Sequence, residues 1–254
     1  DLMERPLATT PQLELKKVSK SYGTTQALVS IDLPLRSAAV HGLVGENGAG
    51  KSTLVKILSG AVAPDGGRIE LGGEAVQLGS PSVARGLGIS TAFQELTLIP
   101  DLTVAENLLL QSGGRWAHGQ GERIRRGSTM AARWGVSSLD MRAKISSLSL
   151  RERQIIEILC AVDRPHNVLI LDEPTSSLLP DDTKWLRSVV KSCVSRVKQN
   201  QIKICENGTI EDMKNGCNAF SSPRISAGFM ADWYDPKWTP NISLDEVATG
   251  QPQA

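Results

Sequence analysis

The sequence has no uninterrupted apolar stretch that approaches the roughly 20 residues needed to span a bilayer. Aromatic residues make up only 4% of the chain, which predicts a core built mainly from aliphatic side chains. The four cysteines form no C-x-x-C pair, and their spacing argues against a zinc site and favours a reducing, cytosolic context. The first residues, DLMERPLATT, lack the basic start and apolar segment of a secretory signal.

No excess of charge of either sign is present, because 28 Lys and Arg residues face 27 Asp and Glu residues. The positive field that favours nucleic acid is therefore absent, and no nucleic-acid partner is expected. Hydrophobic residues make up 40% and charged residues 22% of the 254 residues, as in an ordinary globular protein. This length fits one large domain, or one domain with a subdomain.

The apolar patterns predict an α/β fold. Alternation in QLELKKV and SIDLPLR predicts half-buried strands, and GRIELGG with EAVQLG predicts a hairpin at Gly72-Gly73. The apolar runs VHGLV and VLILD are typical of buried strands. The pattern is mostly helical from about Asp101 to Asp163, and an apolar helical face extends from Asp182 to Lys198. Residues 199–254 are rich in Asn, Gly and Ser and predict an irregular tail, except for QIKIC, which fits a short strand.

The strongest motif is GENGAGKS, from Gly45 to Ser52, which matches G-x-x-x-x-G-K-[ST] between a predicted strand and a predicted helix. Its glycines allow backbone N–H groups to turn toward phosphate oxygens, and the helix N-terminus adds partial positive charge. Lys51 is expected to reach the β- and γ-phosphates of a nucleotide, and Ser52 to hold Mg²⁺. The alternative is a glycine-rich turn that binds nothing.

Two acids, Asp172 and Glu173, follow the apolar run VLIL. Asp172 is expected to contact the Mg²⁺ shell, and Glu173 to orient or deprotonate an attacking water. Taken alone, an acid in this place is more simply a helix cap or part of a surface turn. Parallel sheets, however, bind ligands at the carboxyl ends of neighbouring strands, and the phosphate loop provides such a neighbour. No N-K-x-D guanine motif occurs, so the sequence favours ATP.

Three segments together, VHGLVGENGAGKSTLVKILSG, AFQELTLIPDLTVAENLLL and LILDEPTSSL, resemble the ABC-type ATPases. Within that family they are most similar to the ATP-binding proteins of bacterial ribose, galactose and xylose importers. The resemblance covers roughly Leu13 to Lys198. It implies an α/β P-loop NTPase core with an antiparallel N-terminal sheet and a helical subdomain at about 101–163. An N-terminal extension at 1–11 would precede an ATP-binding domain at 12–198, and a divergent, poorly ordered tail would follow at 199–254. Because such proteins usually carry two ATP-binding domains in tandem, the chain is expected to be the first domain only.

The resemblance also implies roles for individual residues. Tyr22 is similar to the aromatic residue that stacks on adenine, with a core tyrosine as the alternative. Gln94 is similar to the glutamine that reaches Mg²⁺, the attacking water and the membrane partner. The other residues expected to bind ATP are those of the phosphate loop and one serine: Gly45, Glu46, Asn47, Gly48, Ala49, Gly50, Lys51, Ser52, Thr53 and Ser149. The expected Mg²⁺ ligands are Ser52, Gln94 and Asp172, and the expected catalytic residues are Lys51, Gln94 and Glu173.

The partners implied by the resemblance are the transmembrane subunits of an ABC permease and a second ATP-binding domain, supplied by a homodimer or a tandem partner. A periplasmic sugar-binding protein would take part indirectly. The implied location is cytoplasmic, peripheral on the inner face of the cell membrane. Two alternatives stay open: a catalytically impaired ATP-binding pseudo-enzyme, and a soluble ABC ATPase that acts outside transport.

Two departures from the family pattern bear on hydrolysis. The family's signature loop, L-S-x-G-Q in sugar importers, reads LSLRERQ here, with Arg151 in place of glycine and Glu152 in place of glutamine. Because this loop caps the γ-phosphate bound by the opposite domain, a weakened contact between the two domains is expected. In addition, the family has a histidine near the position of Cys205 or Glu206, and no histidine follows His166. ATP binding is therefore the firmer expectation, and hydrolysis the one that requires a test.

Overall fold

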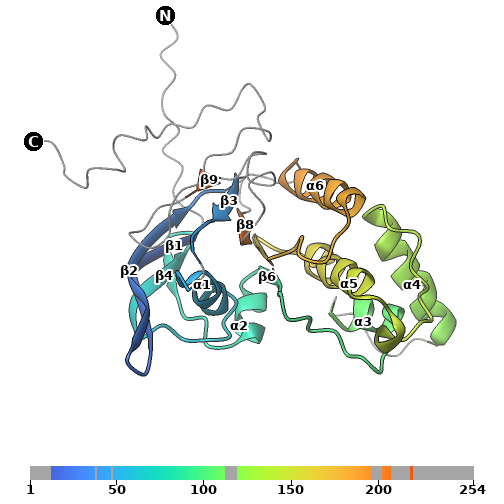
Figure 1. Cartoon of the computed structure of the whole chain (residues 1–254), viewed down its shortest axis with the longest axis horizontal. Helices are drawn as coiled ribbons and strands as arrows, with labels where there is room; N and C mark the ends of the chain where they lie inside the picture. Colours follow the sequence, from blue (N-terminus) through green and yellow to red (C-terminus); the bar gives the residue numbers. More distant parts are fainter. Residues whose placement is uncertain are drawn as a thin grey trace, which may run out of the picture.

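Two β-sheets and a group of helices make up the described part of the computed structural model, namely residues 13–37, 39–46, 48–111, 119–195, 202–206 and 218–219 (Figure 1). The first sheet is antiparallel, with the strand order β2-β1-β4-β5. Its strands are β1 (Leu13–Tyr22), β2 (Thr25–Leu35), β4 (Gly66–Leu71) and β5 (Glu74–Val76). The turn between β4 and β5 is the hairpin predicted at Gly72-Gly73.

Strand β1 contains a bulge that simple alternation does not predict. Leu13, Leu15 and Val18 are all fully buried, although a period of two residues would turn Lys17 inward instead of Val18. The register with β2 shifts between Leu15 and Val18, and Lys17 has a φ of 52°. The extra residue turns Val18 back to the core and leaves Lys17 exposed.

The second sheet is parallel, with the strand order β6-β7-β8-β3-β9. Its strands are β3 (Ala39–Leu43), β6 (Ile89–Ala92), β7 (Val168–Asp172), β8 (Ile202–Glu206) and β9 (Asn218–Ala219). The segment QIKIC, which fits a short strand by sequence, forms most of β8. This strand lies between β3 and β7, so the sheet continues beyond residue 198, where the sequence places the end of the domain.

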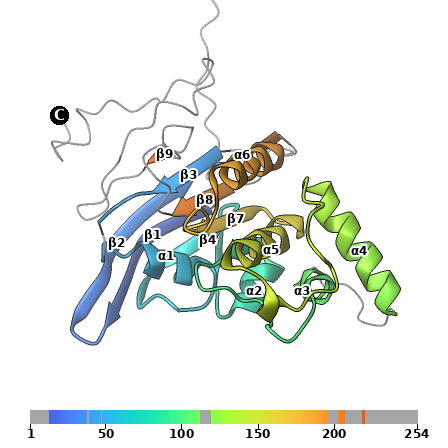
Figure 2. The same ribbon diagram turned by 45° about the vertical axis from the view of Figure 1, so that its right-hand side comes forward.

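The parallel sheet has the antiparallel sheet on one side and helices on the other (Figure 2). Each side holds an apolar core. All five residues of β7 are buried, and their side chains alternate between the two faces. Val168 and Ile170 belong to the core shared with helix α1 (Lys51–Leu58) and the antiparallel sheet. Leu169 and Leu171 belong to the core on the helical face. Burial on both faces explains why this strand reads as a continuous apolar run.

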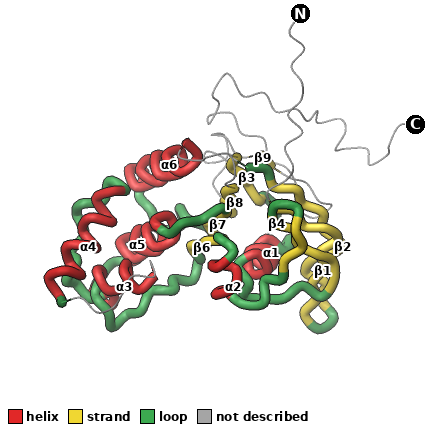
Figure 3. The backbone as a smooth tube through the Cα atoms, turned by 180° about the vertical axis from the view of Figure 1, so that it is seen from behind, coloured by secondary structure: helices red, strands yellow, loops and turns green. Residues whose placement is uncertain are grey.

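The other helices are mostly gathered on that second face, with α4 at the outer edge (Figure 3). Their bounds are α2 (Pro81–Gly86), α3 (Val104–Gln111), α4 (Gln120–Arg133), α5 (Leu150–Asp163) and α6 (Pro180–Ser195). The helical region predicted from Asp101 to Asp163 thus holds α3, α4 and α5. The apolar face predicted for the next helix is buried at Leu186, Val189, Val190 and Cys193. None of the described helices has the length and apolar character needed to cross a membrane.

His41 lies in β3 and is fully buried. Its Nε2 atom lies 3.1 Å from the backbone nitrogen of Arg36. Burial lowers the pKa of His41 from 6.5 to about 4, and the nearby Arg36 charge acts in the same direction.

The free energy of unfolding is expected to fall as the pH drops from about 6.5 to about 4. In that window His41 of the unfolded chain takes up a proton that the buried side chain does not, so acid favours the unfolded state. The complete shift corresponds to roughly 3 kcal/mol. Urea unfolding at pH 7.5 and pH 5 measures the effect. His41→Asn should remove this part of the pH dependence, and an equally steep loss in the variant would contradict the assignment.

Candidate functional site

The phosphate loop joins the end of β3 to α1, and its lysine is folded into the loop. Lys51 is only 4% exposed. Its Nζ atom donates to the carbonyl oxygens of Gly45, at 2.8 Å, and Glu46, at 3.0 Å. Gly48 and Gly50 have φ values of 83° and 94°, which a residue with a side chain rarely adopts. Asn47, a predicted ATP-binding residue, lies outside the described residues.

The first turn of α1 suits an anion. Helix α1 begins after Gly50, which has no side chain that could cap the free N–H groups, and its first turn holds no acidic residue. Ser52 and Thr53, which follow Lys51 directly in the chain, place hydroxyl groups in that turn. Amide donors, hydroxyl groups and one cation together form a donor set that fits phosphate oxygens.

Gly50 also fixes how closely the loop approaches the antiparallel sheet. A Cβ atom at this position would lie 2.4 Å from the carbonyl oxygen of Ala27 and 2.7 Å from Cδ2 of Leu28, both on β2. Real Cβ atoms essentially never come this close to backbone oxygen, so only glycine fits here without a shift of the loop.

The two acids of VLILDE stand at the carboxyl end of β7. Asp172 ends the strand and is 7% exposed. Glu173 follows with a φ of 44°, a backbone conformation that costs free energy in a residue other than glycine. The turn is stabilised by Ser176, whose backbone N–H and side-chain hydroxyl both donate to the Glu173 carbonyl oxygen. Strain at this position is typical of a functional site.

Gln94 and Glu173 are brought together, although they are far apart in the sequence. Nε2 of Gln94 donates to Oε2 of Glu173 at 2.6 Å. The contact follows from the sheet, because β6 and β7 are parallel neighbours and both residues come just after a strand end. An amide and a carboxylate that stand together at this edge can both hydrogen-bond to one water molecule beside them.

A buried carboxylate that sequence reasoning missed anchors the segment after Gln94. Glu157, on α5, is 2% exposed and accepts hydrogen bonds from the backbone N–H of Thr97, at 3.1 Å, and from its hydroxyl, at 2.8 Å. Burial raises the pKa of Glu157, while the bonds from Thr97 act against that rise. The available signal was an acid inside the apolar helical run RQIIEILCAV.

Tyr22 lies at the end of β1 and is 47% exposed, so the alternative of a core tyrosine is wrong. The ammonium group of Lys20 lies 5.7 Å from the centroid of its ring. Tyr22 pairs with Thr25 at the start of β2, two residues before Ala27, which Gly50 approaches. The exposed ring of Tyr22 therefore lies on the β1–β2 strand pair, near the place where the phosphate loop approaches β2.

Ser149 caps the beginning of α5 and is bound to Glu152 of the same helix. The Ser149 backbone N–H and hydroxyl donate to Oε2 of Glu152 at 2.9 and 2.7 Å, and the Glu152 N–H donates back to the serine oxygen. This arrangement is a capping box. The Ser149 side-chain bond, followed by its backbone bond, lowers the pKa of Glu152. The acid in place of the family's glutamine is therefore held within its own helix.

Cys205 and Glu206, where the family's histidine is expected, form the end of β8. In the parallel register, Glu206 is level with Asp172 of β7 on one side and with Leu43 of β3 on the other. The end of β8 thus lies between the strand that leads to the phosphate loop and the strand that carries the two acids.

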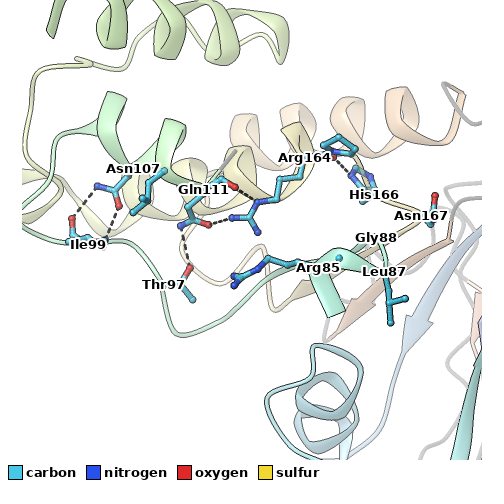
Figure 4. Close-up of a pocket in the computed structure, with 13 residues that line it drawn as sticks. Arg85, Leu87, Gly88, Thr97, Ile99, Asn107, Gln111, Arg164, His166 and Asn167 are labelled. Carbon is cyan, nitrogen blue, oxygen red and sulfur yellow. Dashed lines mark hydrogen bonds between the residues drawn. The ribbon is translucent and has the colours of Figure 1, made fainter. Parts of the chain in front are cut away.

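A cavity of about 990 Å³ opens between the sheet and the helices (Figure 4). Two arginines line it, Arg85 from α2 and Arg164 from the connection after α5. Arg164 donates to the carbonyl oxygen and side chain of Gln111. Ile99 and Leu110, which also line the cavity, are 40% and 45% exposed. The cavity therefore offers both apolar surface and positive charge to a partner.

His166 also lines this cavity and is only 8% exposed. Its Nδ1 atom lies 2.7 Å from the carbonyl oxygen of Arg164.

Comparison with known proteins agrees with this geometry. The model of the ABC transporter family matches residues 28–176. The ribose import ATP-binding protein RbsA of Rhodococcus jostii is 42% identical over 189 residues, which are 73% of this chain and 37% of that protein. The arabinose import ATP-binding protein AraG of Rhizobium meliloti is 44% identical over 228 residues, covering 84% of this chain and 44% of that protein. The chain thus spans about two fifths of the length of these curated relatives.

Solved structures show the same fold. A dimeric ATP-binding cassette, MJ0796, in a post-hydrolysis state with ADP and Pi, superposes with a TM-score of 0.73 and 20% sequence identity. That alignment covers 86% of this chain and 98% of the cassette. A second cassette, MJ1267, gives a TM-score of 0.71 at 22% identity and covers 86% and 91% of the two chains. The predicted α/β fold, with a P-loop core, an antiparallel sheet and a helical part, is confirmed.

Proposed function

Because the chain belongs to the ABC transporter family, we propose that it binds and hydrolyses ATP to drive carbohydrate import through a separate membrane permease. The observation that carries this proposal is the phosphate loop, in which buried Lys51 lies against Gly45 and Glu46 at the start of α1. The contact between Gln94 and Glu173 supports hydrolysis as well as binding. The relatives named for ribose and arabinose import support a sugar as the cargo.

The phosphates of ATP would lie against residues 45–53, with the Lys51 ammonium group on the β- and γ-phosphates. Tyr22 would stack on adenine, for which its exposed ring is suited. Glu173 would accept the proton of the attacking water, and Gln94 would orient that water, because the two side chains are in contact.

The residues proposed for Mg²⁺ are oxygen donors, which this ion prefers. They are the Ser52 hydroxyl, the Gln94 amide and the Asp172 carboxylate, and Asp172 stands at a strand end with 7% exposure. The bound ion would offset the negative charge of the phosphates. These residues of the chain would place it beside the loop.

The proposed partners are a second ATP-binding domain and the transmembrane subunits of a permease, with a periplasmic sugar-binding protein involved indirectly. Ser149, at the start of α5, would face the nucleotide of the second domain. The cavity lined by Arg85 and Arg164 is the proposed contact surface for the permease, since it has room and exposed apolar side chains. Such a protein would be peripheral on the cytoplasmic face of the membrane.

A second candidate is an ATP-binding pseudo-enzyme. It is favoured by the capping box, in which the Ser149 hydroxyl donates a hydrogen bond to Glu152 and is therefore not available to a phosphate. The two candidates differ in turnover and not in nucleotide binding.

ATP affinity and ATP turnover, measured on the same purified chain, separate these candidates. Lys51→Ala is expected to weaken ATP binding roughly 10- to 100-fold, because it removes a charged donor to phosphate. Lys56→Ala is the matched control, since Lys56 is an exposed lysine in the last turn of the same helix. Tight binding without turnover selects the pseudo-enzyme. Absence of ATP binding in the wild-type chain would overturn both candidates.

A further inference from the structure

Arg151, which stands where the family has glycine, is held by an acid on another helix. It occupies the second position of α5, and Asp182 occupies the third position of α6. Nε and Nη2 of Arg151 donate to the two carboxylate oxygens of Asp182 at 2.5 and 2.6 Å, which is a bidentate pair. The Asp182 side chain is only 9% exposed, while the arginine is 44% exposed. Glycine at position 151 could not form this pair.

Asp182 also caps α6, which follows the turn that leads away from Glu173. Its Oδ2 atom accepts a hydrogen bond from the backbone N–H of Leu179 at 3.0 Å, which closes the start of α6. Between Glu173 and Leu179 the chain forms consecutive turns, with Ser176 N–H bonded to the Glu173 carbonyl. The arginine therefore ties the beginning of α5 to the first turn of α6, which follows the segment that carries the proposed base, Glu173.

The neighbouring substitution acts on the same end of α5. Glu152 holds the hydroxyl and backbone N–H of Ser149 in the capping box. The charged groups of Arg151 and Glu152, the two residues that depart from the family pattern, are thus both bonded within this chain. If Ser149 is to contact a nucleotide on a second domain, at least its bond to Glu152 has to be exchanged, while α5 remains fixed to α6.

We propose that the Arg151–Asp182 pair is a lock that holds the signature end of α5 against α6 and slows ATP turnover. Arg151 is then a positioning residue and not a phosphate ligand, because its guanidinium group is paired with the Asp182 carboxylate. The lock regulates the ATPase site proposed above and rests on that function. It acts on the approach of Ser149 to the second domain and leaves the phosphate loop of its own chain untouched.

The test compares the full chain with Asp182→Asn, Arg151→Gly and the double variant. Asparagine still accepts the Leu179 N–H but loses the charge that holds Arg151. The matched control is Asp181→Asn, because Asp181 lies in the same turn of α6 and pairs with exposed Lys184 instead. Steady-state ATP turnover, KM for ATP and hydrogen exchange of amides 150–153 are measured for each.

Asp182→Asn and Arg151→Gly are each expected to raise kcat about fivefold, the size expected for loss of one partly exposed ion pair, with KM changed less than twofold. The double variant should be no faster than the faster single variant. Amides 150–153 should exchange faster in Asp182→Asn and not in Asp181→Asn.

Three outcomes would overturn the lock. Faster turnover in Arg151→Gly with wild-type turnover in Asp182→Asn would mean that Arg151 acts without Asp182. Slower turnover in both would reverse the sign of the proposal. If the wild type and the variants all bind ATP but none hydrolyses it, the proposed hydrolysis fails. The lock is then judged from the hydrogen-exchange data alone. Unchanged exchange at the start of α5 in Asp182→Asn would exclude the lock.

Discussion

Gly50→Ala is expected to lower the free energy of unfolding by several kcal/mol and to abolish measurable ATP binding. Alanine would have to adopt a φ of 94°, and its Cβ atom would lie 2.4 Å from the carbonyl oxygen of Ala27. A left-handed non-glycine residue costs about 1–3 kcal/mol, and overpacking costs a similar amount, so roughly 2–6 kcal/mol is expected in total. Relief of the overlap would move the loop off β2 and displace the N-terminus of α1.

Gly48→Ala is the matched control for this prediction. Gly48 lies in the same loop with a φ of 83°, but a Cβ atom there meets no other atom within 4 Å. Its cost should be that of the backbone conformation alone, about 1–2 kcal/mol. Urea unfolding and titration with a fluorescent ATP analogue measure the two effects. Equal destabilisation by the two substitutions would show that the contact with Ala27 is unimportant.

Glu173→Gln is expected to reduce kcat for ATP at least about 100-fold while ATP affinity changes less than about threefold, because a positioned general base contributes 10²–10⁴ in rate. Glutamine keeps the size of the side chain and can still accept the hydrogen bond from Gln94, but it cannot take a proton. The loss should therefore appear in turnover and not in binding.

Glu95→Gln is the control, since Glu95 is an exposed acid next to Gln94. It removes the same charge from the same region and should leave kcat within twofold of the wild-type value. Single-turnover hydrolysis and nucleotide titration on both variants give the comparison. A Glu173→Gln variant that hydrolyses ATP at the wild-type rate would remove Glu173 from the proposed mechanism.

The parts of the site predicted from sequence are those encoded in short, contiguous segments. GENGAGKS forms the turn between β3 and α1, and the acids Asp172 and Glu173 stand at the end of a buried strand. Local backbone chemistry sets such features, because glycine alone tolerates the loop angles and an apolar run is stable only inside a sheet. The placement of Lys51 against its own loop follows from the same local geometry.

The features that sequence patterns missed depend on residues far apart in the chain. The bulge at Lys17 depends on pairing with β2, and the anchoring of Thr97 by Glu157 depends on how α5 packs. A pattern also cannot tell that Arg151 finds a carboxylate 31 positions away. From the sequence, Arg151 and Glu152 are only replacements for a glycine and a glutamine that weaken a contact with a second domain, whereas packing gives each of them a partner within the chain.

The sequence by itself determined the fold class, the phosphate loop, the two acids and the family to which the chain belongs. Only the tertiary structure decided that Gln94 meets Glu173, that β8 continues the sheet beyond residue 198, and that Arg151 is bound by Asp182. The reason is physical. Backbone preferences and apolar periodicity act over a few residues, whereas a charged side chain takes whichever partner the packed helices and strands bring within hydrogen-bonding distance.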